Sequence, residues 1–139
     1  MEKAVERNEF VEYAHVHSNM YGTSVKAIET VQSMGKICIL DIDIHGLRKV
    51  KESTLECKYI FILPPSMAIL EERLKGRGTE TEEKISLRLH NAHTEMEYGN
   101  IPGNFDALVV NNELSVALEN ILGFLKDWYP AVDFSLRDR

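Results

Sequence analysis

Three short runs dominated by apolar residues, separated by longer amphipathic stretches, set the pattern of this chain. The runs cover residues 37–40, 58–63 and 107–110. Apolar runs without polar alternation are typical of strands buried on both faces of a parallel sheet. The amphipathic stretches between them predict helices, so strands and helices alternate as in βαβ units. The pattern therefore predicts an α/β fold with a parallel sheet flanked by helices.

The part of the chain before the first apolar run is predicted to form a strand, a turn and a helix. Residues 10–17 form a strand candidate, and residues 19–24 are expected to form a turn. Either Thr23 or Ser24 can cap the helix that follows and runs to Met34, because both side chains carry a hydroxyl acceptor.

Two helices joined by a glycine-flanked hinge are predicted between the second and third runs. Ser66 caps the first helix, and Gly76-Arg77-Gly78 breaks it. Residues 79–82 fit a capping box that opens the second helix, which runs to about Tyr98. The last helix is expected to present one continuous apolar face, made of Leu114, Leu118, Ile121, Leu122 and Leu125.

Composition indicates a single globular domain spanning residues 1–139, with a loose tail over 129–139. The formal charge of −6 argues against a nucleic-acid partner, which would favour a basic surface. Cys38 and Cys57 lie in apolar contexts and are expected to be buried thiols in a reducing compartment. The sequence shows neither a signal peptide nor a run long enough for a membrane span, so a cytoplasmic protein without membrane contact is expected.

Two carboxylates, Asp41 and Asp43, follow the run at 37–40 directly. Ligands of open α/β sheets sit beyond the carboxyl ends of the strands, so these acids are expected where chemistry occurs. Carboxylate oxygens suit Mg²⁺, which usually keeps several waters. The alternative is a strand that simply runs into a polar turn.

Three arginines, Arg73, Arg77 and Arg88, surround the predicted glycine hinge. Arginine binds phosphate oxygens through paired N–H groups and stabilises charge in phosphoryl transfer, so the three could form a phosphate clamp. The alternative, which spacing alone favours, is a solvated charged face, because several glutamates lie nearby.

Other polar residues have both a functional and a structural interpretation. Glu12 could accept two hydrogen bonds from a base edge, or it could be a solvated acid at a strand edge. Tyr21 and Thr23 could bind a phosphate through their hydroxyls, or serve in a turn and a helix cap. His90 and His93 do not have a known zinc spacing, so a surface cluster is favoured over a metal site. The sequence contains no G-x-x-x-x-G-K-[ST] phosphate loop.

Six segments occur in a fixed order along the chain: 8–14, 19–24, 35–43, 64–66, 76–81 and 110–111. Together they resemble the guanylate kinases, in register and over nearly all of residues 8–128. The resemblance implies a partial P-loop nucleoside monophosphate kinase fold. It also implies that about 8–24 is a remnant of the GMP-binding region and that about 67–98 forms clamp and lid helices.

The resemblance implies transfer of the γ-phosphoryl group of ATP to GMP, with Mg²⁺ as cofactor. By position, Glu12 resembles the acid that recognises guanine, and Tyr21, Thr23 and Asp43 resemble further GMP contacts. Asp41 resembles the acid that holds Mg²⁺ through water. The residues that resemble the catalytic clamp and lid arginines are Arg73, Arg77 and Arg88; those that resemble ATP contacts are Arg73, Arg77 and Asn111. The family usually has Asp where this chain has Asn112.

The family's first strand, its phosphate loop and the first half of its GMP-binding region have no counterpart in this sequence. Three explanations stay open: a truncated sequence, a short protein that has lost catalysis, or a half that is completed by a partner. Residues 2–8 look like the end of a helix, which favours truncation. The chain alone is expected to be inactive and open to self-association, and the intact protein is expected to be a monomer.

A second function stays open: a non-catalytic guanylate-kinase-like module that binds phosphorylated peptides. The retained acids Asp41 and Asp43 favour the enzyme, because peptide binding alone does not need acids at the metal position.

Overall fold

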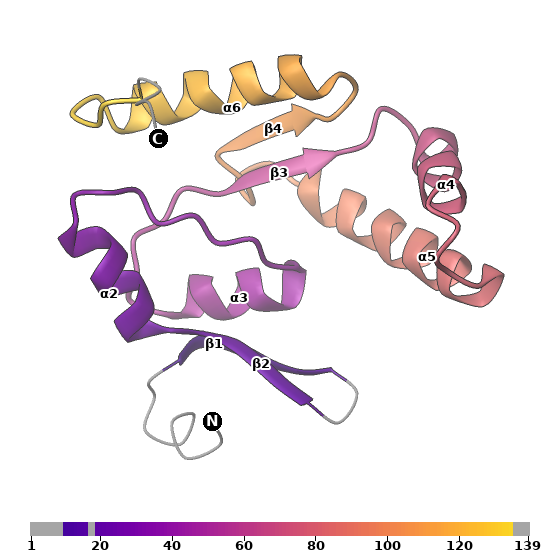
Figure 1. Cartoon of the computed structure of the whole chain (residues 1–139), viewed down its shortest axis with the longest axis horizontal. Coiled ribbons are helices and arrows are strands. Elements are labelled where there is room, and N and C mark those ends of the chain that lie inside the picture. Colours follow the sequence, from indigo (N-terminus) through magenta and orange to yellow (C-terminus); the bar gives the residue numbers. More distant parts are fainter. Residues whose placement is uncertain (1–9, 17–18, 135–139) are drawn as a thin grey trace. The chain divides into compact units, whose positions relative to one another are not determined.

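The computed structural model describes residues 10–16 and 19–134, and it describes side chains from Thr23 onward. The predicted helix end at residues 2–8 and the last part of the predicted tail, 135–139, lie outside these ranges. The chain forms two compact units, Met1–Glu56 with Ala131–Arg139, and Cys57–Pro130. The elements in chain order (Figure 1) are β1 Phe10–Val16, β2 Asn19–Ser24, α2 Val25–Ser33, α3 Ile44–Glu52, β3 Ile60–Leu63, α4 Met67–Gly76, α5 Glu82–Gly99, β4 Ala107–Val110 and α6 Leu114–Trp128.

An antiparallel hairpin, β1 with β2, and the helices α2 and α3 make up the first unit. The strand prediction for residues 10–17 is confirmed over Phe10–Val16, and His17 lies outside the described residues. The turn prediction for 19–24 is wrong, because this segment is strand β2. Hydrogen bonding to β1 outweighs the local turn preference of its Asn, Gly and Ser residues. Ser24, not Thr23, caps α2 by accepting a hydrogen bond from the Ala27 N–H at 3.1 Å.

The segment 36–43 connects α2 to α3 without forming a strand, so the predicted buried strand at 37–40 is wrong. Ile39 in its middle is 74% exposed. A strand requires a neighbour that pairs with its backbone N–H and C=O groups, and no described residue pairs with this segment. The apolar run at 37–40 is therefore a connection between helices and not a strand.

A two-stranded parallel sheet, β3 with β4, is the centre of the second unit. The register runs from Ile60 opposite Ala107 to Leu63 opposite Val110. Beyond the strands the pairing continues, since the Asn111 N–H donates to the Leu63 carbonyl at 2.8 Å. The sheet is flanked by helices: α6 contacts β4, and the end of α5 packs on Phe61 of β3. The predicted α/β class with a parallel sheet is therefore confirmed.

Burial in this sheet differs from the prediction of strands covered on both faces. Val109 is 1% exposed and Ala107 is also buried, whereas Leu108 and Val110 are exposed. Residues along a strand alternate between faces, so one face of β4 is covered and the other is not. The predicted strand at 58–63 is confirmed over Ile60–Leu63 only, and that at 107–110 is confirmed in full. The described residues cover one face of β4 only.

The ends of α4 and α5 follow local capping chemistry, with one difference from the prediction. Ser66 caps α4 through the Ile69 N–H, as predicted, and Gly78 takes the left-handed φ of 65° after the helix ends. Thr81 caps α5 by accepting from the Lys84 N–H at 3.3 Å. The predicted capping box at 79–82 is wrong, because the turn around Gly78 delays the start of α5 to Glu82.

Helix α6 covers β4 with only part of its apolar face. Ala117 is buried, but Leu114 is 77% exposed and Leu118 is also exposed. The predicted continuous inner face of α6 is therefore wrong for its first turns. The cysteines also differ from prediction: Cys38 and Cys57 form no disulfide and are only half-buried.

Across residues 10–16 and 19–134, no helix combines the length and the apolar character needed to cross a bilayer.

Substituting Gly99 with alanine is expected to destabilise the second unit. A Cβ at Gly99 would lie 2.6 Å from Cδ1 and Cε1 of the Phe61 ring. That ring packs against Phe105, with 5.0 Å between the ring centroids, so it has a neighbour that resists a shift. Overpacking of this kind costs about 1–3 kcal/mol. Urea unfolding followed by the fluorescence of Trp128, the single tryptophan, measures the loss.

Gly123→Ala is the matched control for this prediction. Gly123 lies inside α6, and a Cβ there would meet nothing within 4 Å. Alanine is favoured over glycine in a helix by about 1 kcal/mol, so this variant is expected to be as stable as the parent or more stable. Equal stabilities for the Gly99 and Gly123 variants would contradict the packing argument.

Candidate functional site

The hairpin brings the positions of the predicted GMP residues together. Glu12 stands opposite Thr23 in the strand register, and Tyr21 stands opposite Ala14, two positions along each strand. Directly opposite residues on antiparallel strands lie about 4.5–5.5 Å apart at their Cβ atoms. The side chains of Glu12 and Tyr21 lie outside the described part of the structure, and Thr23 is half-buried. The backbone register therefore supports a shared site at these three positions.

The two predicted acids after the first apolar run have different surroundings. Asp43 caps α3: its Oδ1 accepts a hydrogen bond from the Gly46 N–H at 2.8 Å. Asp41 is exposed within the segment 36–43. Asp43 therefore has a structural task that the sequence did not predict, although an Asp immediately ahead of an amphipathic run is a recognisable cap signal.

Arg73 joins helix α4 to the end of strand β4. Its Nη1 donates to the Asn111 carbonyl at 2.7 Å, and its Nη2 donates to the Asn112 carbonyl at 3.3 Å. The structure thus brings together two residues, Arg73 and Asn111, that were both predicted to contact ATP. Because a guanidinium carries five N–H donors, further donors of Arg73 remain for a ligand.

Arg88 is held by a different partner, an acid in the hinge between α4 and α5. Its Nη2 lies 2.7 Å from Oε1 of Glu80. The Arg88 side chain is 54% exposed, and the Glu80 side chain is 14% exposed. The sequence does not predict this pair, because a spacing of eight residues across a loop carries no local signal.

Arg77 is exposed and forms the C-cap of α4. Within the described ranges its side chain makes no hydrogen bond or ion pair. The three predicted clamp arginines therefore differ: Arg73 bonds to carbonyls, Arg88 to a carboxylate, and Arg77 to neither.

The histidine cluster on α5 is a surface feature. His93 Nε2 lies 3.2 Å from Oε1 of Glu97, one turn later, and both side chains are exposed. In the part of the chain that the structure describes, no three or more His, Cys, Asp or Glu residues gather as a metal site would require. The structure thus offers no support for the metal interpretation of His90 and His93.

Comparison with known proteins identifies one family. A family model described as guanylate kinase matches residues 1–128. Guanylate kinase 1 of Oryza sativa subsp. japonica is 52% identical over 121 residues, which is 87% of this chain and 32% of that protein. The guanylate kinase of Schizosaccharomyces pombe is 47% identical over 120 residues, covering 86% of this chain and 59% of that protein. This chain thus spans about a third of the rice relative and 59% of the fission yeast relative.

A solved structure gives the same result for the fold. The crystal structure of guanylate kinase from Anaplasma phagocytophilum matches with a TM-score of 0.67 and 26% identity. The match covers 91% of this chain and 60% of that one. The fold, the order of the motifs and the match over residues 1–128 agree, and the chain belongs to the guanylate kinase family.

Proposed function

We propose that this chain carries GMP-binding residues and the lid of a guanylate kinase. The whole protein transfers the γ-phosphoryl group of ATP to GMP and releases ADP and GDP. The observation that carries the proposal is the contact of Arg73 with the Asn111 carbonyl. It joins the base of the lid helices to the carboxyl end of β4, which is where ligands bind in parallel sheets.

The first unit supplies the acceptor side of the reaction. Glu12 accepts hydrogen bonds from the ring N–H and the exocyclic amine of guanine, a pair of donors that adenine does not offer. Tyr21 and Thr23 donate their hydroxyls to GMP. Asp43 lies beside the nucleotide while it caps α3 through its Oδ1.

The second unit supplies positive charge to the phosphates. Arg77 and Arg88 are exposed on either side of the hinge, so their N–H groups are available to phosphate oxygens. Phosphoryl transfer depends mainly on positioning and on stabilising the charge of the transferred group. Arg73 contributes to the ATP side through donors that its two carbonyl contacts leave available.

The residues present fit Mg²⁺ through a single carboxylate. Mg²⁺ usually binds one or two carboxylates together with waters and substrate phosphates, and not an all-protein cage. Asp41 is exposed and would hold the ion through water. When bound, Mg²⁺ neutralises charge on the phosphates.

The proposal is tested with a chimera in which the N-terminal part of the Schizosaccharomyces pombe relative precedes this chain. With Mg²⁺, ATP and GMP, a coupled ADP-release assay is expected to show turnover that depends on GMP, and AMP in place of GMP serves as the control. Arg77→Ala is expected to lower kcat roughly 100-fold or more, because it removes a donor to the transferred group. A chimera that binds a phosphorylated peptide but releases no ADP would favour the binding-module alternative.

A further inference from the structure

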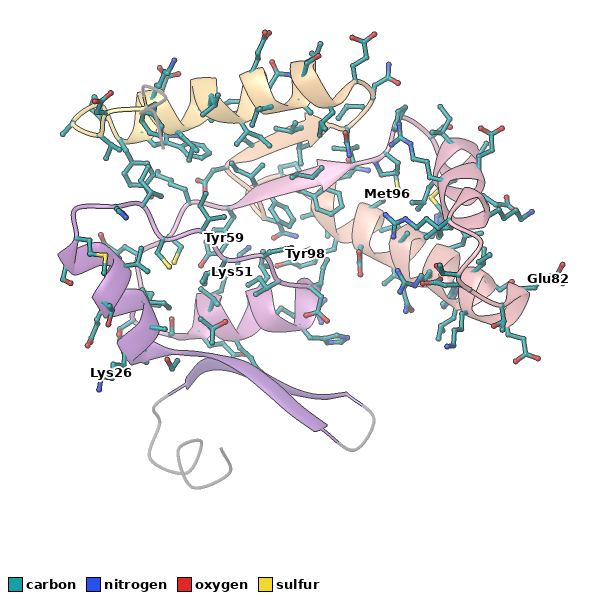
Figure 2. The ribbon with its side chains drawn as sticks, in the orientation of Figure 1. Lys26, Lys51, Tyr59, Glu82, Met96 and Tyr98 are labelled. Atoms are coloured by element: carbon teal, nitrogen blue, oxygen red, sulfur yellow. The ribbon has the colours of Figure 1, made fainter. Side chains whose placement is uncertain are left out.

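Glu80 lies in the hinge between α4 and α5, and its side chain is largely buried. It directly precedes Thr81, whose hydroxyl bond to the Lys84 N–H fixes the start of α5. Glu82, the first residue of α5, is exposed and points away from the helix, as Figure 2 shows. Glu80 instead places Oε1 against Arg88, and its side chain is only 14% exposed. Its position in the hinge is therefore set by the cap on one side and by Arg88 on the other.

The second oxygen of this carboxylate is buried and unsatisfied. Glu80 Oε2 is inaccessible to solvent and has no hydrogen-bond partner among the described residues. A buried carboxylate that loses its last cationic partner is costly, because nothing replaces its hydration. Arg88 is therefore expected to stay on Glu80 when a ligand arrives.

Arg88 can bind a ligand without leaving Glu80. Its guanidinium has five N–H donors, of which the Glu80 contact uses Nη2, and the side chain is more than half exposed. Ile85, one turn earlier in α5, is buried and anchors the same stretch of helix. One side of the guanidinium is thus fixed and the other is open to solvent.

We propose that Glu80 is a positioning residue that holds the Arg88 guanidinium ready for the phosphates of a nucleotide. The inference rests on the proposed function for the identity of the ligand. An arginine side chain that is not held by another residue loses much rotamer freedom when it binds a phosphate. If Glu80 already restricts the Arg88 side chain, the entropy cost of binding is lower. Arg77, which no described residue holds, is the contrasting case on the other side of the hinge.

The direction in which one substitution changes anion affinity separates this role from simple charge repulsion. Removing an acid near an anion site should tighten anion binding, because a like charge disappears. Removing a positioning acid should weaken binding instead. The two ideas therefore predict opposite changes for Glu80→Ala.

The experiment measures binding of tripolyphosphate to the 139-residue chain by NMR, following the Nε–Hε signals of the arginines. The Arg88 signal is assigned with Arg88→Lys. Glu80→Ala is expected to raise the Kd for tripolyphosphate about 3- to 10-fold, which corresponds to about 0.7–1.4 kcal/mol. Glu80→Gln keeps an acceptor oxygen for Arg88 and is expected to recover part of the affinity.

Glu71→Ala is the matched control, because it removes the same charge from the same unit. Glu71 pairs with Lys75 at 2.9 Å on the surface of α4, where it raises the pKa of Lys75. This variant is expected to leave the Kd within about twofold of the parent, since a surface pair contributes little. It should also leave the Arg88 signal unchanged.

A second readout needs no ligand and no catalysis. In the unaltered chain the Arg88 Nη2 hydrogens should exchange slowly with solvent, because Glu80 holds Nη2, and Glu80→Ala should make that exchange faster. Thermal unfolding checks that each variant is folded. An unchanged or tighter Kd in Glu80→Ala, or no tripolyphosphate binding by the unaltered chain, would overturn the proposal. Glu80-dependent binding together with a chimera that does not phosphorylate GMP would leave the positioning role intact and reject the kinase function.

Discussion

The 139-residue chain by itself is expected to release no ADP above background when Mg²⁺, ATP and GMP are supplied. Its sequence contains no G-x-x-x-x-G-K-[ST] loop. In P-loop enzymes the backbone N–H groups and the Lys of that loop surround the β- and γ-phosphates, and its Ser or Thr holds Mg²⁺. Asp41 and the three arginines Arg73, Arg77 and Arg88 are not expected to replace such a cradle.

The expected difference is large, because positioning and charge stabilisation account for nearly all catalysis of phosphoryl transfer. Removing a single preorganised hydrogen-bond donor lowers kcat roughly 100- to 1000-fold, and the phosphate loop contributes several such donors. The measurement compares ADP release by the chain with that by the chimera at equal concentration. Arg77→Ala in both proteins controls for a contaminating kinase, since contaminating activity would be unaffected. GMP-dependent turnover by the short chain that disappears with Arg77→Ala would show that the loop is dispensable.

Glu12→Gln in the chimera is expected to impair the use of GMP far more than the use of ATP. In the proposed site the carboxylate would accept two hydrogen bonds from guanine, whereas the amide would offer one acceptor and one donor, so one contact would become repulsive. Leaving a buried donor unpaired costs about 1–3 kcal/mol, which is about 5- to 150-fold in affinity. The change should appear in kcat/KM for GMP, with the KM for ATP nearly unchanged.

The control for this variant is Glu29→Gln, which makes the same chemical change at an exposed position of α2 in the same unit. This variant is expected to leave kcat/KM for GMP and the KM for ATP unchanged. If Glu12→Gln reduced kcat/KM for GMP and for ATP equally, Glu12 would not be the residue that recognises guanine.

Several elements could be predicted from the sequence because their causes are local. Ser66 caps α4 through a residue three positions away, as the sequence predicted, and the runs around Ile60–Leu63 and Ala107–Val110 form strands. The register of β1 with β2, which places Glu12 opposite Thr23, did not follow from the sequence, because the sequence predicted a turn for β2. Capping and strand preference depend on a few neighbouring residues, which a sequence displays directly.

The residues of the candidate site were chosen as a group only through the order of the six motifs, and their roles stay predictions. Spacing alone favoured a solvated face for the three arginines. The structure shows that two of the three have specific partners, Arg73 on the Asn111 and Asn112 carbonyls and Arg88 on Glu80. These partners lie outside the range of any helical or strand period, so no local pattern predicts them.

The sequence by itself determined the family, the order strand, two helices, strand, helix of the second unit, and the Ser66 cap, since each depends on residue order or on contacts within one turn. Only the tertiary structure decided that residues 37–40 form no strand and that α6 leaves Leu114 exposed. It also decided that Glu80 holds Arg88. The physical reason is the same in each case. A strand, a buried face and an ion pair each need a partner from elsewhere in the chain, and an apolar run or a charge does not specify that partner.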